Sequence, residues 1–314
     1  MAILEVKNLN LGFNLESGFC QALYDISFSL EKGQMHALVG ESGCGKSISA
    51  MSILQLLPKN AKITSGEILY NGENLLEKKD IHKLRGSKIA LIPQDPMTSL
   101  NPLYTVGNQL LEVIKIHQNL KGDKAYKKAV EALEAVQIPC AEMRMNSYPH
   151  EFSGGMKQRA IIAMALACNA EILIADEPTT ALDVTIQAQI MNLLNEIKQT
   201  HGTSILLITH DLALVSENAD NVSVMYAGRI VEEALANDIF TKPEHPYTQA
   251  LLRSLPSNNK LHIIEGQPPS IQEKITGCRF NPRCEKCIDI CKKEVPPFEK
   301  VGNNHFSACF RNKD

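Results

Sequence analysis

A glycine-rich segment near the start of the chain has the residue types and spacing needed to hold phosphate groups. This P-loop reads Gly40-Glu41-Ser42-Gly43-Cys44-Gly45-Lys46-Ser47 and lies between an apolar run at 35–39 and a predicted helix. Glycines let backbone N–H groups turn toward phosphate oxygens, and the helix N-terminus adds partial positive charge. Lys46 would contact the β- and γ-phosphates, and the Ser47 hydroxyl would ligate Mg²⁺. The segment therefore predicts a nucleoside triphosphate site, in preference to a glycine turn without a ligand.

Two adjacent carboxylates follow another apolar run further along the chain. Asp176 comes directly after the predicted strand at 172–175, and Glu177 is its neighbour. We expect Asp176 at the carboxyl edge of the sheet, where such an acid holds Mg²⁺ through water. Two acids at the start of a helix would also be favoured by the helix dipole alone, without any catalysis. The P-loop upstream favours the catalytic interpretation.

A third segment lies between the P-loop and the acidic pair. It reads Phe152-Ser153-Gly154-Gly155-Met156-Lys157-Gln158-Arg159. By itself, Ser-Gly-Gly indicates only the start of a helix with Ser153 as its N-cap. In combination with the P-loop and the acidic pair, it resembles the ABC-type ATPases, which hydrolyse ATP between two facing copies of the motor. The resemblance implies an α/β P-loop NTPase fold with a RecA-like parallel-sheet core, an antiparallel β-subdomain, a helical lobe and, here, a small cysteine-rich C-terminal extension.

The resemblance also implies roles for individual residues. Glu177 would polarise the attacking water, and Gln94, at the end of a predicted strand, would contact Mg²⁺ and water. Mg²⁺ would then be held by Ser47, Gln94 and Asp176. Ser153, Gly154 and Gly155 would form the signature loop, which docks on the γ-phosphate bound by the opposite subunit. Such a site is completed only on dimerisation, with ATP binding both surfaces.

Three more positions match the family pattern. Asp183 would lie at the dimer seam, and His210, which follows a predicted strand, would hydrogen-bond the γ-phosphate as a third catalytic residue. Adenine stacks on an aromatic side chain in many nucleotide sites. Phe13 is the best-placed candidate, Phe19 is the alternative, and a plain core role for either residue stays open.

The order of predicted elements supports this fold class. Strand-like segments at 35–39, 89–92, 172–175 and 205–208 alternate with helical segments such as 48–57 and 186–200. Alternation of this kind builds a largely parallel sheet covered by helices on both faces. We expect residues 1–240 to form the ATPase domain, with a helical lobe at about 97–164, and residues 241–314 to form a C-terminal domain.

Composition limits the functional classes. The chain has 314 residues and a net charge of −3, so it lacks the basic surface typical of nucleic-acid binders. None of its apolar stretches approaches the roughly 20 residues of a membrane span. Its start lacks the layout of a secretory signal. We therefore expect a cytosolic protein that binds no nucleic acid.

Longer motifs narrow the resemblance to one branch of the family, the dipeptide and oligopeptide importer ATPases. These motifs are the segments 94–102, 178–185 and 245–252. The branch implies an ATP-hydrolysing subunit that powers peptide uptake from the cytoplasmic face of the inner membrane. Its partners would be a second ATPase subunit in a heterodimer, two membrane permease subunits and an extracytoplasmic peptide-binding protein. Nickel, glutathione or another small solute as cargo, and a soluble ABC ATPase acting on nucleic acid or translation, are the alternatives.

Five cysteines gather near the C-terminus, at 278, 284, 287, 291 and 309. In a reducing compartment such a cluster indicates metal binding more than disulfides. Cys278, Cys284, Cys291 and Cys309 resemble the family's C-terminal cluster, which implies a [4Fe–4S] cofactor. Zinc on four thiolates and the absence of any metal stay open. By the resemblance Cys287 is left out of the ligand set.

Overall fold

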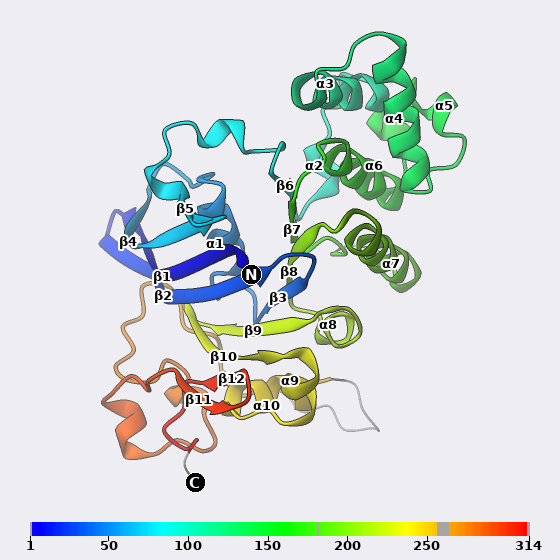
Figure 1. Cartoon of the computed structure of the whole chain (residues 1–314). Helices are drawn as coiled ribbons and strands as arrows, with labels where there is room; N and C mark the ends of the chain where they lie inside the picture. Colours follow the sequence, from blue (N-terminus) through cyan, green and yellow to red (C-terminus); the bar gives the residue numbers. More distant parts are fainter. Residues whose placement is uncertain (1, 181, 256–263, 313–314) are drawn as a thin grey trace. The chain divides into compact units, whose positions relative to one another are not determined.

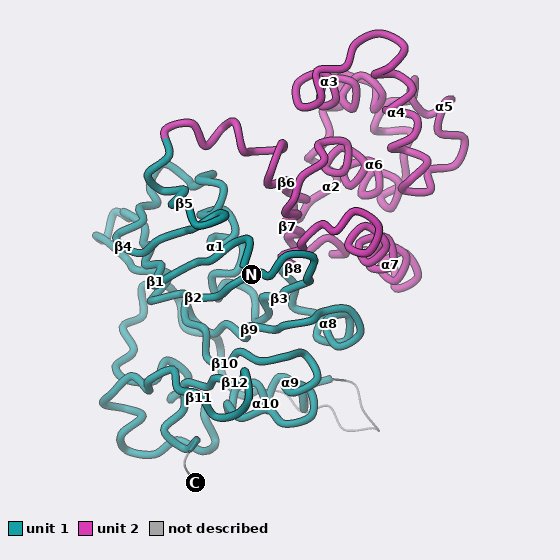
Figure 2. Tube along the Cα trace, in the orientation of Figure 1, with its two compact units in different colours: residues 1–78, 208–314 teal, residues 79–207 magenta. Residues whose placement is uncertain are grey.

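A computed structural model describes residues 2–180, 182–255 and 264–312 and divides the chain into two units, each described here by itself. The first unit combines Met1–Lys78 with Ile208–Asp314, and the second is Lys79–Leu207. They are drawn in teal and magenta in Figure 2. The P-loop and the C-terminal extension share the first unit. The acidic pair and the Ser-Gly-Gly segment belong to the second unit.

The first unit begins with an antiparallel sheet of order β2-β1-β4-β5. Its strands are β1 (Ala2–Leu15), β2 (Gly18–Glu31), β4 (Ala61–Tyr70) and β5 (Glu73–Asn74). Leu4, Leu9 and Leu11 on β1 are completely buried. Asn71 and Gly72 join β4 to β5 with positive φ angles of 48° and 82°, the geometry of a type I′ turn. This turn joins β4 and β5 as an antiparallel hairpin.

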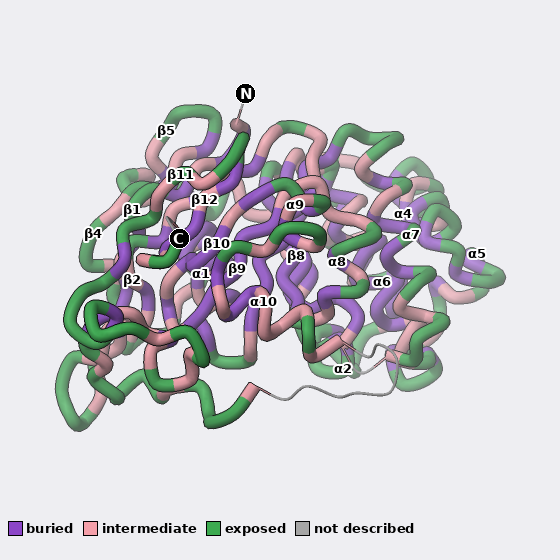
Figure 3. The backbone as a smooth tube through the Cα atoms, turned by 90° about the horizontal axis from the view of Figure 1, so that it is seen from below, coloured by how far each residue is buried: buried purple, intermediate pink, exposed green. Residues whose placement is uncertain are grey.

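A second sheet of the first unit holds the P-loop. Strand β3 (Met35–Val39) is buried at every position and runs parallel to β9 (Asn221–Tyr226), as expected for a strand covered on both faces. Strand β10 (Arg229–Leu235) pairs antiparallel with β9. Figure 3 draws β9 and β10 mostly in the colour of buried residues. The helices of this unit are α1 (Lys46–Ile53), α8 (Leu212–Asn218), α9 (Ala236–Thr241) and α10 (Pro246–Arg253).

The C-terminal extension is joined to this sheet through its last strands. The pairing continues from β10 to β12 (His305–Ser307) and from β12 to β11 (Glu299–Gly302). Beside it, Glu232 of β10 is completely buried and accepts hydrogen bonds from the backbone N–H groups of Glu244 and His245. The His305 ring lies 2.7 Å from the same carboxylate. A buried carboxylate is costly unless it is paired, so these contacts fix the extension to the core.

The second unit pairs β6 (Ile89–Ile92) in parallel with β7 (Ile172–Asp176). Strand β8 (Ser204–Thr209) begins here, where the Ser204 N–H donates to the Glu171 carbonyl oxygen. Figure 1 shows the helices of this unit, which are α2 (Pro96–Ser99), α3 (Val106–Gln118), α4 (Asp123–Ala135), α5 (Ala141–Arg144), α6 (Gly154–Ala167) and α7 (Val184–His201). Among the helices that the structure describes, none is both long and apolar enough to cross a bilayer.

The described residues also include five short 3₁₀ helices: η1 (Leu75–Glu77), η2 (Ile81–Lys83), η3 (Pro149–Glu151), η4 (Asn281–Arg283) and η5 (Asp289–Lys292). Helix α1 is shorter than the sequence suggests. It ends at Ile53, Leu54 and Gln55 form a turn in which Gln55 has a left-handed backbone, and Leu56 and Leu57 lie outside the helix.

The Glu232–His305 pair predicts a specific pH dependence of stability. Its hydrogen bond to Glu232 raises the pKa of His305 above the ordinary value of 6.5. A raised pKa stabilises the fold below that ordinary value, and the contribution is lost as the pH rises through the folded pKa. His305→Gln should therefore lower the free energy of unfolding at about pH 6 more than at about pH 8.5. Denaturant unfolding at several pH values measures this, and a wild-type-to-variant difference that is constant with pH would contradict it.

Candidate nucleotide-binding site

The P-loop follows β3 and depends on two glycines that no other residue could replace. Gly40 has φ 153°, and a Cβ there would lie 2.1 Å from the carbonyl oxygen of Met225. Gly45 has φ 108°, and its Cβ would lie 2.6 Å from Leu23 Cδ2. The Gly228 N–H donates to the Cys44 carbonyl oxygen at 2.9 Å. The loop backbone is thus packed directly against β9 and the turn that follows it.

Lys46 lies at the centre of this loop and is 4% exposed. Its ammonium group donates to the carbonyl oxygens of Gly40 and Glu41, at 2.7 and 3.0 Å. Helix α1 starts at this lysine, with no side-chain cap and no acidic residue in its first turn. The N–H groups of an uncapped first turn suit an anion. Ser47 is the next residue of that turn, as the phosphate-binding prediction requires.

The acidic pair ends strand β7 in the second unit. Asp176 is 2% exposed, and Glu177 is 9% exposed with a left-handed φ of 46°. Oε2 of Glu177 accepts hydrogen bonds from Gln94 Nε2 at 3.0 Å and from Thr180 Oγ1 at 2.9 Å. A non-glycine residue in this conformation costs about 1–3 kcal/mol, and such strain concentrates at functional sites. The structure therefore brings Gln94 and Glu177 together and fixes the direction of the carboxylate.

Thr180 is a contact that the sequence analysis missed. It lies in the turn after Glu177, where its N–H donates to the Glu177 carbonyl oxygen at 3.1 Å. The separation of three residues between Glu177 and Thr180 is that of one tight turn. A hydroxyl residue three positions after an acid could have predicted this hydrogen bond from the sequence.

The Ser-Gly-Gly segment forms the N-terminus of α6, with Ser153 Oγ accepting from the Met156 N–H at 3.3 Å. The two glycines differ in the room around them. A Cβ on Gly154 would meet Leu182 Cδ2 at an ordinary 3.7 Å, while one on Gly155 would lie 3.0 Å from Ile186 Cγ2. Asp183 caps the neighbouring α7 by accepting from the Ile186 N–H at 3.0 Å. The signature segment and the start of α7 are therefore packed together.

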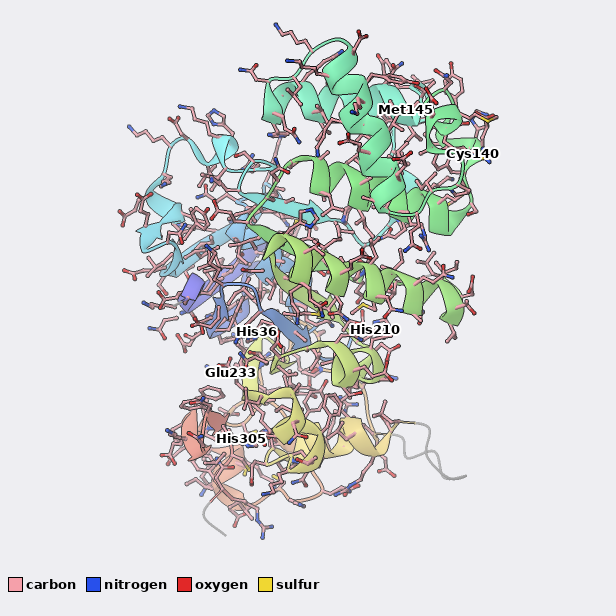
Figure 4. All side chains as sticks on the ribbon, turned by 45° about the vertical axis from the view of Figure 1, so that its right-hand side comes forward. His36, Cys140, Met145, His210, Glu233 and His305 are labelled. Atoms are coloured by element: carbon pink, nitrogen blue, oxygen red, sulfur yellow. The ribbon has the colours of Figure 1, made fainter. Side chains whose placement is uncertain are left out.

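The remaining predicted residues belong to the first unit. His210 is exposed and lies between β8 and α8, where Figure 4 labels it. Phe13 is half-buried on β1 opposite Cys20 and Ala61. Phe19 is 49% exposed, and a Cβ on Gly12 would lie 2.3 Å from its ring. Both aromatic candidates are thus on the same hairpin.

Four of the tail cysteines line one small cavity, namely Cys278, Cys284, Cys291 and Cys309. Cys287 is not among its lining residues. Burial, together with the charges of neighbouring thiols, raises the pKa of Cys278 to about 12 and that of Cys284 to about 11. Among the described residues, no group of three or more His, Cys, Asp or Glu side chains has the arrangement needed for a metal ion.

Comparison with known proteins gives two matches to protein-family models. Residues 23–180 match the ABC transporter family, and residues 231–291 match the C-terminal region of oligopeptide/dipeptide transporters. The chain belongs to the ABC transporter ATPases. It is 48% identical, over 99% of this chain and 96% of the relative, to a probable peptide ABC transporter ATP-binding protein of Sinorhizobium fredii. It is 46% identical to the oligopeptide transport ATP-binding protein OppD of Escherichia coli, over 99% and 93% of the two chains.

Solved structures agree with this assignment. The dimeric post-hydrolysis state of the ATP-binding cassette MJ0796, bound to ADP and Pi, matches with a TM-score of 0.67 and 27% identity. The match covers 74% of this chain and 98% of that one. The fold is therefore that of an ABC-type P-loop ATPase, and the predicted enzymatic class is confirmed.

The geometry of Glu177 predicts the effect of neutralising it. Glu177→Gln keeps the size of the side chain but removes the charge that would polarise water, so ATP hydrolysis should fall by about 100-fold or more while ATP still binds. Phosphate release and calorimetric titration measure the two quantities. Glu171→Gln is the matched control, because this acid just before β7 forms a surface ion pair with Lys88. If Glu177→Gln hydrolysed ATP at the wild-type rate, Glu177 would not be the residue that polarises the attacking water.

Proposed function

We propose that this ATPase powers an importer that carries dipeptides or oligopeptides across the cytoplasmic membrane. The observation that carries the proposal is the second family match, at residues 231–291. An ABC module alone is common to many transporters, whereas this C-terminal region is described for oligopeptide and dipeptide transporters. Relatives named as peptide-transport ATPases match over nearly their whole length.

In the proposed cycle the P-loop N–H groups and Lys46 bind the β- and γ-phosphates. Ser47, Gln94 and Asp176 would hold Mg²⁺, which would supply positive charge to the transferring phosphoryl group. Glu177, oriented by Gln94 and Thr180, aligns a water molecule whose oxygen attacks the γ-phosphorus as the bond to ADP breaks. His210 hydrogen-bonds the γ-phosphate, and Phe13 stacks on adenine. Because phosphoryl transfer has a loose transition state, positioning and charge supply most of the catalysis.

The signature segment serves a nucleotide bound by a second ATPase subunit. Ser153 and Gly154 lie at the start of α6, where the helix dipole and free space at Gly154 suit a phosphate approaching from another chain. Asp183, exposed beside them, lies at the same seam. We assign the second subunit as a different ATPase, which makes a heterodimer with two composite sites.

The helical lobe supplies a surface for the membrane permease. A groove along α3 is lined by this helix, by the loop before it and by Met164 of α6, with polar and apolar residues that include Tyr104, Gln109 and Ile116. Leu103 is 79% exposed, Ile116 67% and Tyr104 56%. Exposed apolar groups around a groove are typical of protein docking sites. Two permease subunits would dock there, so the ATPase is peripheral at the inner membrane, and an extracytoplasmic protein delivers the peptide.

Import of nickel, glutathione or another small solute would use the same machinery, because the ATPase does not contact the cargo. Deletion of the gene should abolish growth on defined dipeptides as the nitrogen source. Complementation with the wild-type gene should restore growth, and complementation with Lys46→Ala should not. If the deletion strain still grew on dipeptides but no longer grew on another nutrient, that nutrient and not a peptide would be the cargo.

We further propose that the cysteine cavity holds a [4Fe–4S] cluster on Cys278, Cys284, Cys291 and Cys309. All four cysteines line one cavity, so their thiolates could ligate one cluster. Among the described residues no group of side chains has the arrangement for a metal ion, so the proposal rests on the shared cavity and on the resemblance to the family's C-terminal cluster. The cluster would link distant parts of the extension, a structural role.

The cysteine assignment predicts a difference between two neighbouring variants. Cys284→Ala should lose the iron and the broad visible absorbance of the anaerobically purified protein, because it removes one ligand. Cys287→Ala should keep both, since this thiol does not line the cavity. Iron determination and absorption spectra measure the result. Protein without iron, or equal loss in both variants, would contradict the assignment.

The signature segment gives a test of the composite site. Gly154→Asp fits the fold, because the position has space and an acid is favoured in the first turn of a helix. Its charge would repel a phosphate from the partner, so ATP-driven pairing with the second ATPase should be lost while this chain still binds ATP. Gly154→Ala is the uncharged control and should pair. Size-exclusion chromatography with ATP measures pairing, and a Gly154→Asp protein that pairs normally would overturn the trans role.

A further inference from the structure

Glu41, the second residue of the P-loop, has all of its hydrogen-bonding groups occupied. Its N–H donates to the Tyr247 hydroxyl at 3.0 Å, and its carbonyl oxygen accepts from Lys46 Nζ at 3.0 Å. Its carboxylate receives two hydrogen bonds from the Arg283 guanidinium, at 2.7 and 3.0 Å. Moving this residue therefore disturbs the lysine that binds phosphate.

Two of these partners come from the C-terminal part of the first unit, coloured teal in Figure 2. Tyr247 is on α10 and is completely buried. Arg283 ends the short helix η4 and is separated from Glu41 by 242 residues in sequence. A two-point contact between Arg and a carboxylate fixes direction as well as distance. The extension thus reaches into the nucleotide site.

Arg283 is itself held rigidly. Its side chain is 5% exposed, and its Nε donates to the Glu265 carbonyl oxygen at 3.0 Å. The guanidinium lies over the Tyr226 ring, 5.8 Å from the centroid. Tyr226 packs in turn on Tyr247 and Phe280, with centroids 4.5 and 5.1 Å away. The arginine is therefore a stiff link and not a mobile surface charge.

The same link leads to the cysteine cavity. Cys284 follows Arg283 directly and lines the cavity together with Phe280. The Cys278 N–H donates to the Cys291 carbonyl oxygen at 2.8 Å, and a Cβ on Gly277 would lie 2.2 Å from that oxygen. Because this backbone is closely packed, a movement of the residues that line the cavity would also move Arg283.

We propose that Arg283 is a positioning residue of the ATP site, through which the C-terminal extension holds the P-loop in its phosphate-binding shape. The extension and the nucleotide are then coupled in both directions, because an equilibrium coupling between two sites is reciprocal. Loss of the arginine weakens ATP binding, and bound ATP tightens the packing around the cysteine cavity. The inference depends on ATP binding at the P-loop and not on the identity of the cargo.

The first test compares two arginine variants of the full chain. Arg283→Met should weaken ATP binding by about tenfold, within the usual range of such couplings. In the assembled transporter it should raise KM for ATP and leave kcat unchanged, since the Glu177 contacts lie in the other unit. Arg253→Met is the matched control, because it breaks the exposed Arg253–Glu285 ion pair of the same region. Equal ATP affinity in wild type and Arg283→Met would overturn the proposal.

A second set of variants separates positioning from general loss of stability. Glu41→Gln attacks the same contact from the other side and decides the question if Arg283→Met does not fold. The double variant should bind ATP no more weakly than the weaker single variant, because both remove one interaction. Arg283→Lys, which restores charge without the two-point geometry, should recover part of the affinity. Fully additive losses in the double variant would indicate unrelated structural damage and overturn the proposal.

The reciprocal effect has a readout independent of ATPase activity. In protein freed of any bound iron, ATP should slow the alkylation of Cys278 and Cys284, followed by mass spectrometry. The exposed Cys140 of the second unit is the internal control and should react at one rate throughout. ATP should have no effect on Cys278 and Cys284 in Arg283→Met. Protection that persists in Arg283→Met would show that the coupling does not pass through this arginine.

Discussion

The P-loop can bind phosphate only if its backbone keeps conformations, with positive φ at Gly40, Gly43 and Gly45, that most residues rarely adopt. The structure meets the requirement by pressing the loop against β9, where Gly40 meets the Met225 carbonyl oxygen so closely that no side chain fits. Lys46 closes the loop from within by bonding two of its carbonyl oxygens. The position of every phosphate-binding group follows from this packing.

The catalytic carboxylate is subject to a similar constraint in the second unit. Glu177 has a left-handed backbone conformation that residues other than glycine rarely adopt. Two hydrogen bonds determine where its carboxylate points. One donor, Gln94, follows β6, and the other, Thr180, lies in the next turn. Because β6 and β7 are parallel neighbours, residues that follow their carboxyl ends can meet. The pairing of β6 with β7 thus stabilises the strained backbone of Glu177.

Residues that act through local patterns were predictable from the sequence. The P-loop, the strand before Asp176 and the N-cap at Ser153 depend on neighbours within a few positions, and each pattern has few alternatives. The contact between Arg283 and Glu41 had no such signal, because pairing across 242 residues depends on how the whole unit packs. The choice between Phe13 and Phe19 also stayed open, since both lie on one hairpin and no described contact separates them. The family resemblance selected the four cysteines that line the cavity over Cys287, whereas their spacing alone selected neither the set nor what it binds.

The final strand of the chain, β12, supplies a partner for the buried Glu232, a role that no ATP-binding motif indicates. This carboxylate is completely buried in β10, and one of its three partners is His305, close to the C-terminus. A protein shortened before His305 would keep every nucleotide motif but leave that acid partly unsatisfied beside the P-loop strands. Loss of activity after such trimming would therefore reflect damage to the motor's interior, and truncation is a poor way to ask whether the tail regulates transport.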